Sequence, residues 1–197
     1  MKISVVAVIH NEEQRLESCL KQFTNYTDDF VVFDTESSDN SFNIAKKFTN
    51  KVYLVPHIAQ PDPYFEPAML RAKNEWYLIA VSDEVWDEEC LKHLEDYNKK
   101  TIDVVQFHRL ENGQNDGSLH MRLMRKGKVL ITDLLDWWIP EDETKMTVSK
   151  YLIEHNRTEE QIRYSAQFRK DSSVYIKQKY RFTNMEPYKS RIAQMPY

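Results

Sequence analysis

Short apolar runs alternate with amphipathic stretches through the first half of the chain. A run returns about every 25 residues, at 3–9, 30–34, 52–55, 76–81 and 102–107. Runs of this length are typical of buried strands, and strands separated by helices of roughly 10–15 residues are typical of parallel pairing. The pattern therefore predicts an α/β layer.

Four helices are expected between these runs. The first opens at Asn11, with acidic residues in its first turn and Gln14 at the capping-box position. The second starts at Asp39. The third is short, over residues 67–73, because the Pro-rich stretch before it reads as a loop. Asp87 caps the fourth helix.

The pattern changes after residue 108. A turn or hairpin at ENGQNDG precedes strand-like runs near 119–124 and 128–132, and a helix is expected from Thr158 to about Lys170. No internal repeat is visible. We therefore expect one domain over residues 1–197, with a regular half, 1–108, and a variable half, 109–197.

Composition narrows the class of protein. The chain is 41% apolar and 29% charged, which is typical of a globular protein with a sizeable core. Its first apolar run is far shorter than the ~20 residues that span a bilayer and has no cleavage site after it, so a cytoplasmic protein is expected. Cys19 and Cys90 are isolated, which argues against a disulfide or a zinc site and favours reduced core cysteines.

The number and positions of the glycines exclude two common nucleotide-binding motifs. The chain has three glycines, Gly113, Gly117 and Gly127, so the first hundred residues contain none. The dinucleotide-binding fingerprint and the P-loop both need glycines directly after a strand. A nucleotide would therefore be bound by side chains and a metal.

The last residues, 169–197, are basic and aromatic. They hold seven Lys or Arg and two acidic residues, although the whole chain has a net charge of −4. Peripheral contact with an anionic membrane at the inner face, or with an acidic partner, is one interpretation. A solvated face with packed aromatics is the other. No nucleic-acid partner is expected, because the chain is acidic and lacks a recognised motif.

Polar residues follow three of the predicted strands directly. They are His10-Asn11-Glu12, Asp34 and Ser82-Asp83-Glu84. Ligands of open α/β sheets bind outside the carboxyl ends of the strands. Asn11 and Asp39 could instead be helix caps, and Asp34 could begin a turn. Carboxylates crowded on one edge repel each other unless a cation lies between them, which favours a divalent metal with oxygen ligands.

Three stretches carry a resemblance to a known family: ISVVAVIHNEEQRLESCL, FVVFDTESSDNSFNIAKKF and EWYLIAVSDEVW. They resemble the opening blocks of family 2 glycosyltransferases with the GT-A fold, in particular the branch that acts on lipopolysaccharide-type acceptors. The resemblance covers about residues 2–90 and extends through LHMRLMRKGKV, 119–129. It implies one GT-A domain with a mostly parallel sheet and helices on both faces. Length and pattern also suggest a compact viral member from a thermophilic archaeal host.

The resemblance implies roles for the rim residues. Val8, His10, Asn11 and Glu12, together with Asp34, would hold the base and ribose of a nucleotide-diphosphate sugar. His10 stands where the family often has an aromatic that stacks on the base.

The segment VSD, 81–83, occupies the place of the metal-binding Asp-x-Asp. Val81 stands at the first Asp, which leaves Ser82 beside the nucleotide and Asp83 as the ligand of Mn or Mg. Arg71 is the nearest candidate for a nucleotide-contacting arginine, and a solvated helix arginine is the alternative. His155 is a further candidate metal ligand, although a single histidine near a helix start is more often structural.

Members of this family invert the anomeric centre, so the implied reaction is a single in-line displacement with one carboxylate as base. Alignment on Arg122 favours Asp136 for that role over Asp133. Trp137 or Trp138 would line the acceptor cleft, where an indole can stack on a sugar face. The acceptor would be a glycan, a glycolipid or a glycoprotein.

Three hypotheses compete. The leading one is a metal-dependent glycosyltransferase. The second is a non-catalytic nucleotide-sugar-binding or scaffold protein, because Val81 replaces the first Asp of the motif. A nucleotidyltransferase is third, since the Gly-rich basic loop after the first strand is absent.

Overall fold

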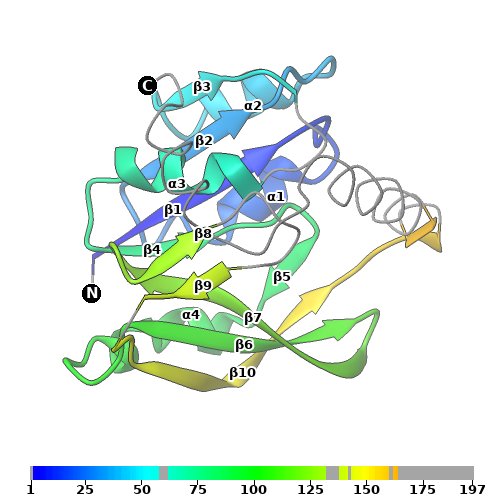
Figure 1. The fold of residues 1–197 in the computed structure, drawn as a ribbon. Coiled ribbons are helices and arrows are strands. Elements are labelled where there is room, and N and C mark those ends of the chain that lie inside the picture. Colours follow the sequence, from blue (N-terminus) through cyan, green and yellow to red (C-terminus); the bar gives the residue numbers. More distant parts are fainter. Residues whose placement is uncertain (1, 58–61, 132–137, 142, 160–161, 164–197) are drawn as a thin grey trace, which may run out of the picture.

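The computed structural model describes residues 2–57, 62–131, 138–141, 143–159 and 162–163. Its centre is an eight-stranded sheet with the order β3-β2-β1-β4-β7-β6-β10-β5. The strands are β1 (Ile3–Ile9), β2 (Phe30–Asp34), β3 (Val52–Leu54), β4 (Trp76–Ile79), β5 (Glu84–Trp86), β6 (Val104–Glu111), β7 (Gln114–Arg125) and β10 (Met146–His155). A separate hairpin joins β8 (Val129–Ile131) to β9 (Trp138–Pro140) (Figure 1).

The first four strands pair in parallel, as the alternating pattern predicts. β1 lies between β2 and β4, and β3 extends the sheet beyond β2. The second half is mixed: β7 runs antiparallel to β4 and β6, and β10 runs parallel to β6 and antiparallel to β5. The prediction of an α/β fold with a largely parallel central sheet is confirmed.

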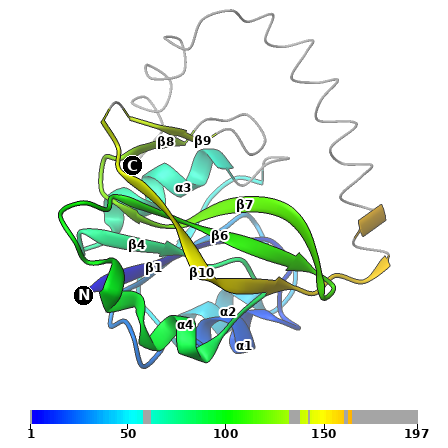
Figure 2. The ribbon, with the colours of Figure 1, turned by 90° about the horizontal axis from the view of Figure 1, so that it is seen from below.

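Helices cover both faces of the sheet (Figure 2). The helices α1 (Leu16–Lys21), α2 (Ser41–Lys46) and α4 (Glu88–Lys92) lie on one face, and α4 is followed by a 3-10 helix, Leu94–Tyr97. On that face Leu20, Ile44 and Leu91 share one core with Phe107. The helix α3 (Asp62–Arg71) covers the other face with a second core. Both cysteines are buried and free, as predicted.

The helix α2 begins at Ser41, two residues after its predicted start, and two other helices begin further from theirs. α1 begins at Leu16 rather than Asn11, because Asn11 has a left-handed backbone with φ of 54° and its side chain bonds the neighbouring loop instead of capping a helix. α3 begins at Asp62, inside the stretch predicted as a loop. Pro63 fits the first turn of a helix, where no intrahelical N–H bond is needed.

Three of the described strands were not predicted: β5, β9 and β10. β5 has three residues, and the chain reaches it by crossing from β4 to the far edge of the sheet. β10 lies in a stretch read as irregular, and its outward positions are exposed along most of its length. β7 also begins at Gln114, directly after the hairpin turn at Gly113, where φ is 81°. Together these strands bring His155 beside the end of β4.

Of the helix expected from Thr158, only its start is described. The Ile162 N–H donates to the Thr158 carbonyl oxygen at 3.0 Å, and the remainder lies outside the described residues. Among the described helices none is both long and apolar enough to cross a membrane.

Candidate functional site

The carboxyl ends of β1, β2 and β4 meet at one edge of the sheet, here called the rim. Asp34 ends β2 at the rim beside Ile9 of β1, and it is fully buried. Its Oδ1 accepts the Ser37 N–H at 2.7 Å, but its Oδ2 is buried without a hydrogen-bond partner. An unpaired buried carboxylate oxygen is costly, which makes this atom a candidate acceptor for a ligand.

The loops after β1 and β2 are tied together through Asn11. Its backbone N–H donates to the Ser37 hydroxyl at 2.9 Å, and its side-chain oxygen accepts the Ser38 N–H at 2.8 Å. The Glu12 N–H donates to the Ser41 hydroxyl at 2.7 Å. Asn11 therefore fixes the shape of the rim. It does not cap a helix.

His10 lies at the rim against a second histidine. The rings of His10 and His57 lie against each other, with centroids 3.9 Å apart and planes tilted by 32°. The Nδ1 of His10 donates to the Thr35 carbonyl oxygen at 2.7 Å, since a carbonyl can only accept. His57 also covers one face of the His10 ring. The stacking of His10 on a base stays a prediction.

The chain turns sharply after β4. The Val81 carbonyl accepts the Glu84 N–H at 3.0 Å and the Cys19 thiol at 3.4 Å. Burial, together with the carboxylates of Glu84 and Asp83, raises the pKa of Cys19 to about 12. Cys19 is therefore a neutral donor that holds the turn, and the turn presents Ser82 and Asp83 at the rim.

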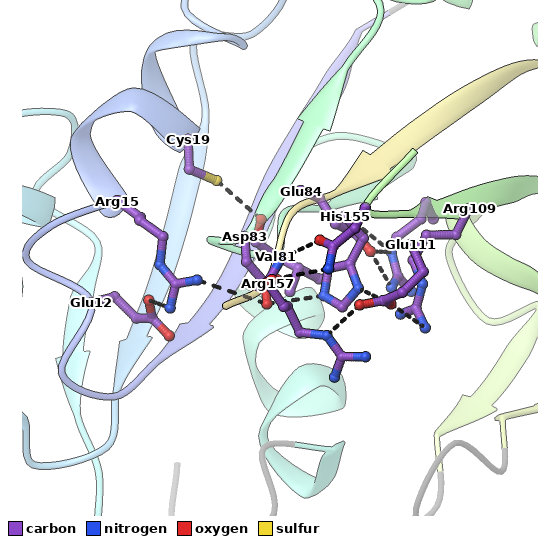
Figure 3. A network of polar contacts seen from close by, with 12 residues as sticks. Glu12, Arg15, Cys19, Val81, Asp83, Glu84, Arg109, Glu111, His155 and Arg157 are labelled. Atoms are coloured by element: carbon purple, nitrogen blue, oxygen red, sulfur yellow. Dashed lines mark hydrogen bonds and ion pairs between the residues drawn. The ribbon is translucent and has the colours of Figure 1, made fainter. Parts of the chain in front are cut away.

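Asp83 and Glu111 are bridged by His155 (Figure 3). The Asp83 Oδ2 lies 2.9 Å from the His155 Nε2, and the Glu111 Oε2 lies 2.8 Å from the Nδ1. Only a ring with protons on both nitrogens can donate to both carboxylates. Arg157 donates from Nε to the other oxygen of Glu111 at 2.8 Å. Three elements that are distant in sequence thus meet in one chain of contacts.

This arrangement favours the ionised form of both carboxylates. Burial raises the pKa of Asp83, but the bond and charge of His155 and the charge of Arg15 outweigh it, so the pKa is lowered. Burial also opposes the ionisation of Glu111, and the bonds from Arg157 and His155 lower its pKa. Asp83 Oδ1 is nevertheless buried without a partner.

Glu12 and Asp83 share one arginine. The Arg15 Nη2 lies 3.2 Å from the Glu12 Oε2, and its Nη1 lies 4.0 Å from the Asp83 Oδ2. Burial raises the pKa of Glu12, and repulsion from Asp83 adds to this, although bonds from Ser82 and Arg15 oppose it. One arginine balances the charge of only one of these two carboxylates, so a further positive charge at the rim would be favourable.

A buried ion pair fixes the residue after Asp83. The Glu84 side chain accepts three hydrogen bonds from Arg122, at 2.7, 2.9 and 3.2 Å, and the residue is 2% exposed. The pairing of β6 with β7 shifts between Val105 and Gln106. Arg122 is the extra residue of β7 at this bulge. Bulges of this kind redirect side chains near functional sites. Here the bulge turns Arg122 onto Glu84.

The other predicted residues are distributed as follows. Val8 packs against the core under α3, and the Ser82 side chain lies near Glu12 and lowers the pKa of that carboxyl. The Arg71 guanidinium lies over the rings of Tyr53 and Phe33, with its carbon 4.9 and 5.3 Å from their centroids, and donates to the Pro67 carbonyl. The nucleotide-binding roles of these residues stay predictions.

The predicted catalytic and acceptor residues are not seen. Asp133, Asp136 and Trp137 lie outside the described residues, as does the segment 169–197. Trp138 begins β9, and its side chain lies outside the description. The roles of these residues stay predictions.

Sequence reasoning missed several members of the site. Glu111 was not singled out, because the strand that carries His155 beside it was not predicted. Glu111 and His155 are register partners on β6 and β10. The spacing Arg109-x-Glu111 puts these two side chains on one side of β6, and this period of two was the available signal.

The residues present suit a metal that takes most of its ligands from a substrate. Among the described residues no group of three or more His, Cys, Asp or Glu side chains converges on one point. Asp83 offers an unpartnered oxygen, and the His155 Nε2 faces the same carboxylate. Glu111 bonds the far nitrogen of His155, which is the usual way to orient a metal-binding imidazole. Mg²⁺ sites often consist of one or two protein groups with substrate phosphates and water.

Comparison with known proteins identifies a family. The pattern of Glycosyl transferase family 2 matches residues 4–157. An uncharacterized glycosyltransferase of Rickettsia typhi is 32% identical over 97 residues, which is 48% of this chain and 32% of the relative. One from Rickettsia conorii is 30% identical over 94 residues, 48% of this chain and 33% of the relative. The chain thus spans about a third of the length of the curated relatives that it matches.

Solved structures share the fold. Glucosyl-3-phosphoglycerate synthase from Mycobacterium tuberculosis, in complex with Mn²⁺ and UDP-glucose, superposes with a TM-score of 0.56 at 14% identity, over 89% of this chain and 78% of that chain. S. aureus TarS 1-349, in complex with UDP, gives a TM-score of 0.54 at 18% identity, over 85% of this chain and 64% of that chain. At these identities the likeness is one of fold.

Proposed function

Because this chain belongs to glycosyl transferase family 2, we propose that it transfers a sugar from a nucleotide-diphosphate donor to a hydroxyl of an acceptor. The observation that carries the proposal is the line of contacts from Asp83 through His155 to Glu111, at the rim that also holds Asp34. It supplies an acidic, oriented site where a diphosphate and its cation would be held.

The base of the donor would lie at the β2 end of the rim. Asp34 Oδ2 is buried and unpartnered, so it would accept a hydrogen bond from a ring N–H of the base. His10, held by Thr35 and lying against His57, would pack beside it. UDP is the nucleotide to test first, since the two solved neighbours above were crystallised with UDP or UDP-glucose.

The diphosphate would lie at the end of β4. Asp83 and His155 would hold Mn²⁺ or Mg²⁺, which when bound supplies positive charge against the leaving diphosphate. Glu111 would orient the imidazole through Nδ1. The Arg15 guanidinium, between Glu12 and Asp83, would add positive charge on the α1 side.

The acceptor would approach from the second half of the chain. We propose that Asp136, or Asp133, takes the proton of the acceptor hydroxyl as its oxygen displaces the diphosphate, with inversion at the sugar carbon. Trp137 or Trp138 would stack on the acceptor. A glycan, a glycolipid or a glycoprotein fits this role, and contact of 169–197 with a membrane, the lipopolysaccharide-type acceptor and a viral source stay predictions.

A non-catalytic nucleotide-sugar-binding protein is the second candidate. The observation that favours it is Val81, which packs against the apolar core under α3 where the family motif has its first aspartate. Such a protein would bind UDP and UDP-sugars without turnover.

The test measures UDP binding by calorimetry, with and without Mn²⁺, and transfer or hydrolysis of a panel of UDP-sugars. Mn²⁺ is expected to strengthen UDP binding to the wild type, and Asp83→Asn should abolish that gain. Glu88→Gln is the control, because this carboxylate is exposed and pairs with Lys92 at the surface. Absence of UDP-sugar binding would contradict both candidates, whereas binding without turnover would favour the second.

A further inference from the structure

Arg109 is a largely buried cation that lacks a close carboxylate partner among the described residues. Its side chain is 13% exposed, and its Nε is buried without a hydrogen-bond partner. The nearest ion-pair contact in the described chain joins its Nη2 to the Glu111 Oε2 at 3.7 Å, which is too long for a hydrogen bond. An arginine in this position is only weakly compensated.

The neighbouring carboxylates are committed to other groups. Glu84 accepts three bonds from Arg122. Glu111 accepts one bond from Arg157 and one from His155. Within the described part of the network, three arginines therefore meet two glutamates, and Arg109 is the arginine left over.

The surroundings also oppose the charge of Arg109. Burial lowers its pKa, and the positive charges of Arg122 and Arg157 add to that effect, against the attraction of Glu84 and Glu111. A buried charge without a full partner destabilises a fold. A position of this kind is readily explained if a ligand supplies the missing negative charge.

Arg157 lies on the same carboxylate and is held in place. Its backbone N–H donates to the Asn112 side-chain oxygen at 2.8 Å, and the Asn112 amide donates back to the Arg157 carbonyl at 3.0 Å. These reciprocal bonds join the end of β10 to the β6–β7 turn. Its Nε donates to Glu111, and within the described part of the chain its terminal nitrogens form no hydrogen bond or ion pair. Two guanidinium groups thus flank Glu111 with donors to spare.

We propose that Arg109 and Arg157 bind a phosphate group of the acceptor substrate. This inference rests on the proposed function. A phosphate presents several oxygens, and guanidinium forks pair with such oxygens through parallel N–H bonds. The acceptor would accordingly be a phosphorylated sugar, lipid or glycan.

The groups on the two sides of His155 assign this phosphate to the acceptor rather than the donor. Asp83 lies on the Nε2 side of His155, where the cation and Arg15 would hold the donor diphosphate. Arg109 and Arg157 lie on the Nδ1 side, at Glu111. A phosphate bound there would be a second one, contributed by the acceptor.

The test uses inorganic phosphate as the probe, titrated calorimetrically into the metal-free full chain. Arg109→Gln and Arg157→Gln should each weaken phosphate binding at least about tenfold, since a hydrogen bond to a charged group contributes ~1.5–3 kcal/mol. Arg163→Gln is the matched control, because Arg163 is 81% exposed and pairs with Glu159. Arg109→Lys keeps the charge and should retain part of the binding. If Arg109→Gln does not fold, Arg109→Lys and Arg157→Gln decide.

A second experiment distinguishes a phosphate of the acceptor from the diphosphate of the donor. UDP is titrated with Mg²⁺ into the same variants, and then phosphate is titrated into the wild-type complex with UDP. UDP affinity should stay within about twofold in Arg109→Gln, and UDP should leave phosphate binding in place. Equal loss of UDP and phosphate binding, or competition between them, would assign the arginines to the donor and overturn the proposal. So would unchanged phosphate binding in both variants. If the wild type binds phosphate but no UDP, the proposed function fails and the anion site stands apart from it.

Discussion

The imidazole of His155 lies 2.9 Å from the carboxylate of Asp83, across two elements that are 72 residues apart in the sequence (155 minus 83). A histidine in this place can either pair with Asp83 as a cation or share a metal with it. The second role requires the Nε2 to lose its proton while the Nδ1 keeps the bond to Glu111. Metal binding and proton release are therefore expected to be linked at this site.

The first prediction concerns Glu111, which orients His155. Glu111→Gln should weaken Mn²⁺ binding about 10- to 100-fold, the usual effect of removing the carboxylate behind a metal-binding histidine. Titration of Mn²⁺ followed by electron paramagnetic resonance measures this directly. Glu154→Gln is the matched control, since this exposed neighbour of His155 lies outside the network. Equal Mn²⁺ affinity in Glu111→Gln and the wild type would contradict the role of Glu111.

The second prediction concerns the base of the donor. Asp34→Asn keeps the acceptor for the Ser37 N–H but exchanges a carboxylate for an amide. Affinity for uridine and for UDP should fall by the same factor, about tenfold or more, because the lost bond is to a charged oxygen. Calorimetry with both ligands measures the two factors, and Asp28→Asn, at an exposed carboxylate, is the control. A loss confined to UDP would place Asp34 at the diphosphate instead.

The first half of the fold could be predicted from the sequence because its strands are buried on both faces. A continuous apolar run such as Trp76–Ile79 signals a strand directly, and all four of its residues are buried. The rule that parallel strands align their carboxyl ends then placed Asp34 and Asp83 at one rim without further information.

The second half could not be predicted in the same way. β10 has one exposed face, and its register with β6 shifts between Val148 and Leu152, which breaks the alternation of polar and apolar positions. Without β10, nothing in the sequence joins His155 to Asp83. The pairing of Glu84 with Arg122 likewise depends on a bulge, which leaves no local signal.

The third prediction concerns that buried pair. Arg122→Met leaves the Glu84 carboxylate buried without its partner and should lower the free energy of unfolding by about 3–5 kcal/mol. Adding Glu84→Gln in the same chain should recover part of that loss, because no uncompensated charge remains. Urea denaturation measures both, with Lys92→Gln at an exposed ion pair as the control that leaves the midpoint unchanged. A double variant less stable than Arg122→Met would contradict this view.

Two carboxylates of the site have pKa shifts of opposite sign. The pKa of Glu111 is lowered by Arg157 and His155 despite burial, so Glu111 stabilises the fold above its ordinary value of 4.5 and loses that contribution as the pH falls through the lower folded value. The pKa of Glu12 is raised by burial. Its protonated form stabilises the fold below pH 4.5, and that contribution is lost as the pH rises through the higher folded value.

The fourth prediction follows from these signs. At pH 7 Glu111→Gln should lower the melting temperature and Glu12→Gln should raise it, each by about 2–4 °C, the shift that ~1 kcal/mol gives in a chain of this size. The difference for Glu12→Gln should vanish below pH 4.5, because that carboxyl is then protonated in both the folded and the unfolded chain. The difference for Glu111→Gln should shrink as the pH falls below 4.5 and vanish only below its lowered folded pKa. Calorimetric melting of the metal-free chain from pH 3.5 to 8 measures the curves. If the melting temperatures of Glu12→Gln and the wild type run parallel over this pH range, the prediction is contradicted. Arg15 alone would then compensate the charge of the Glu12 carboxylate, without a metal.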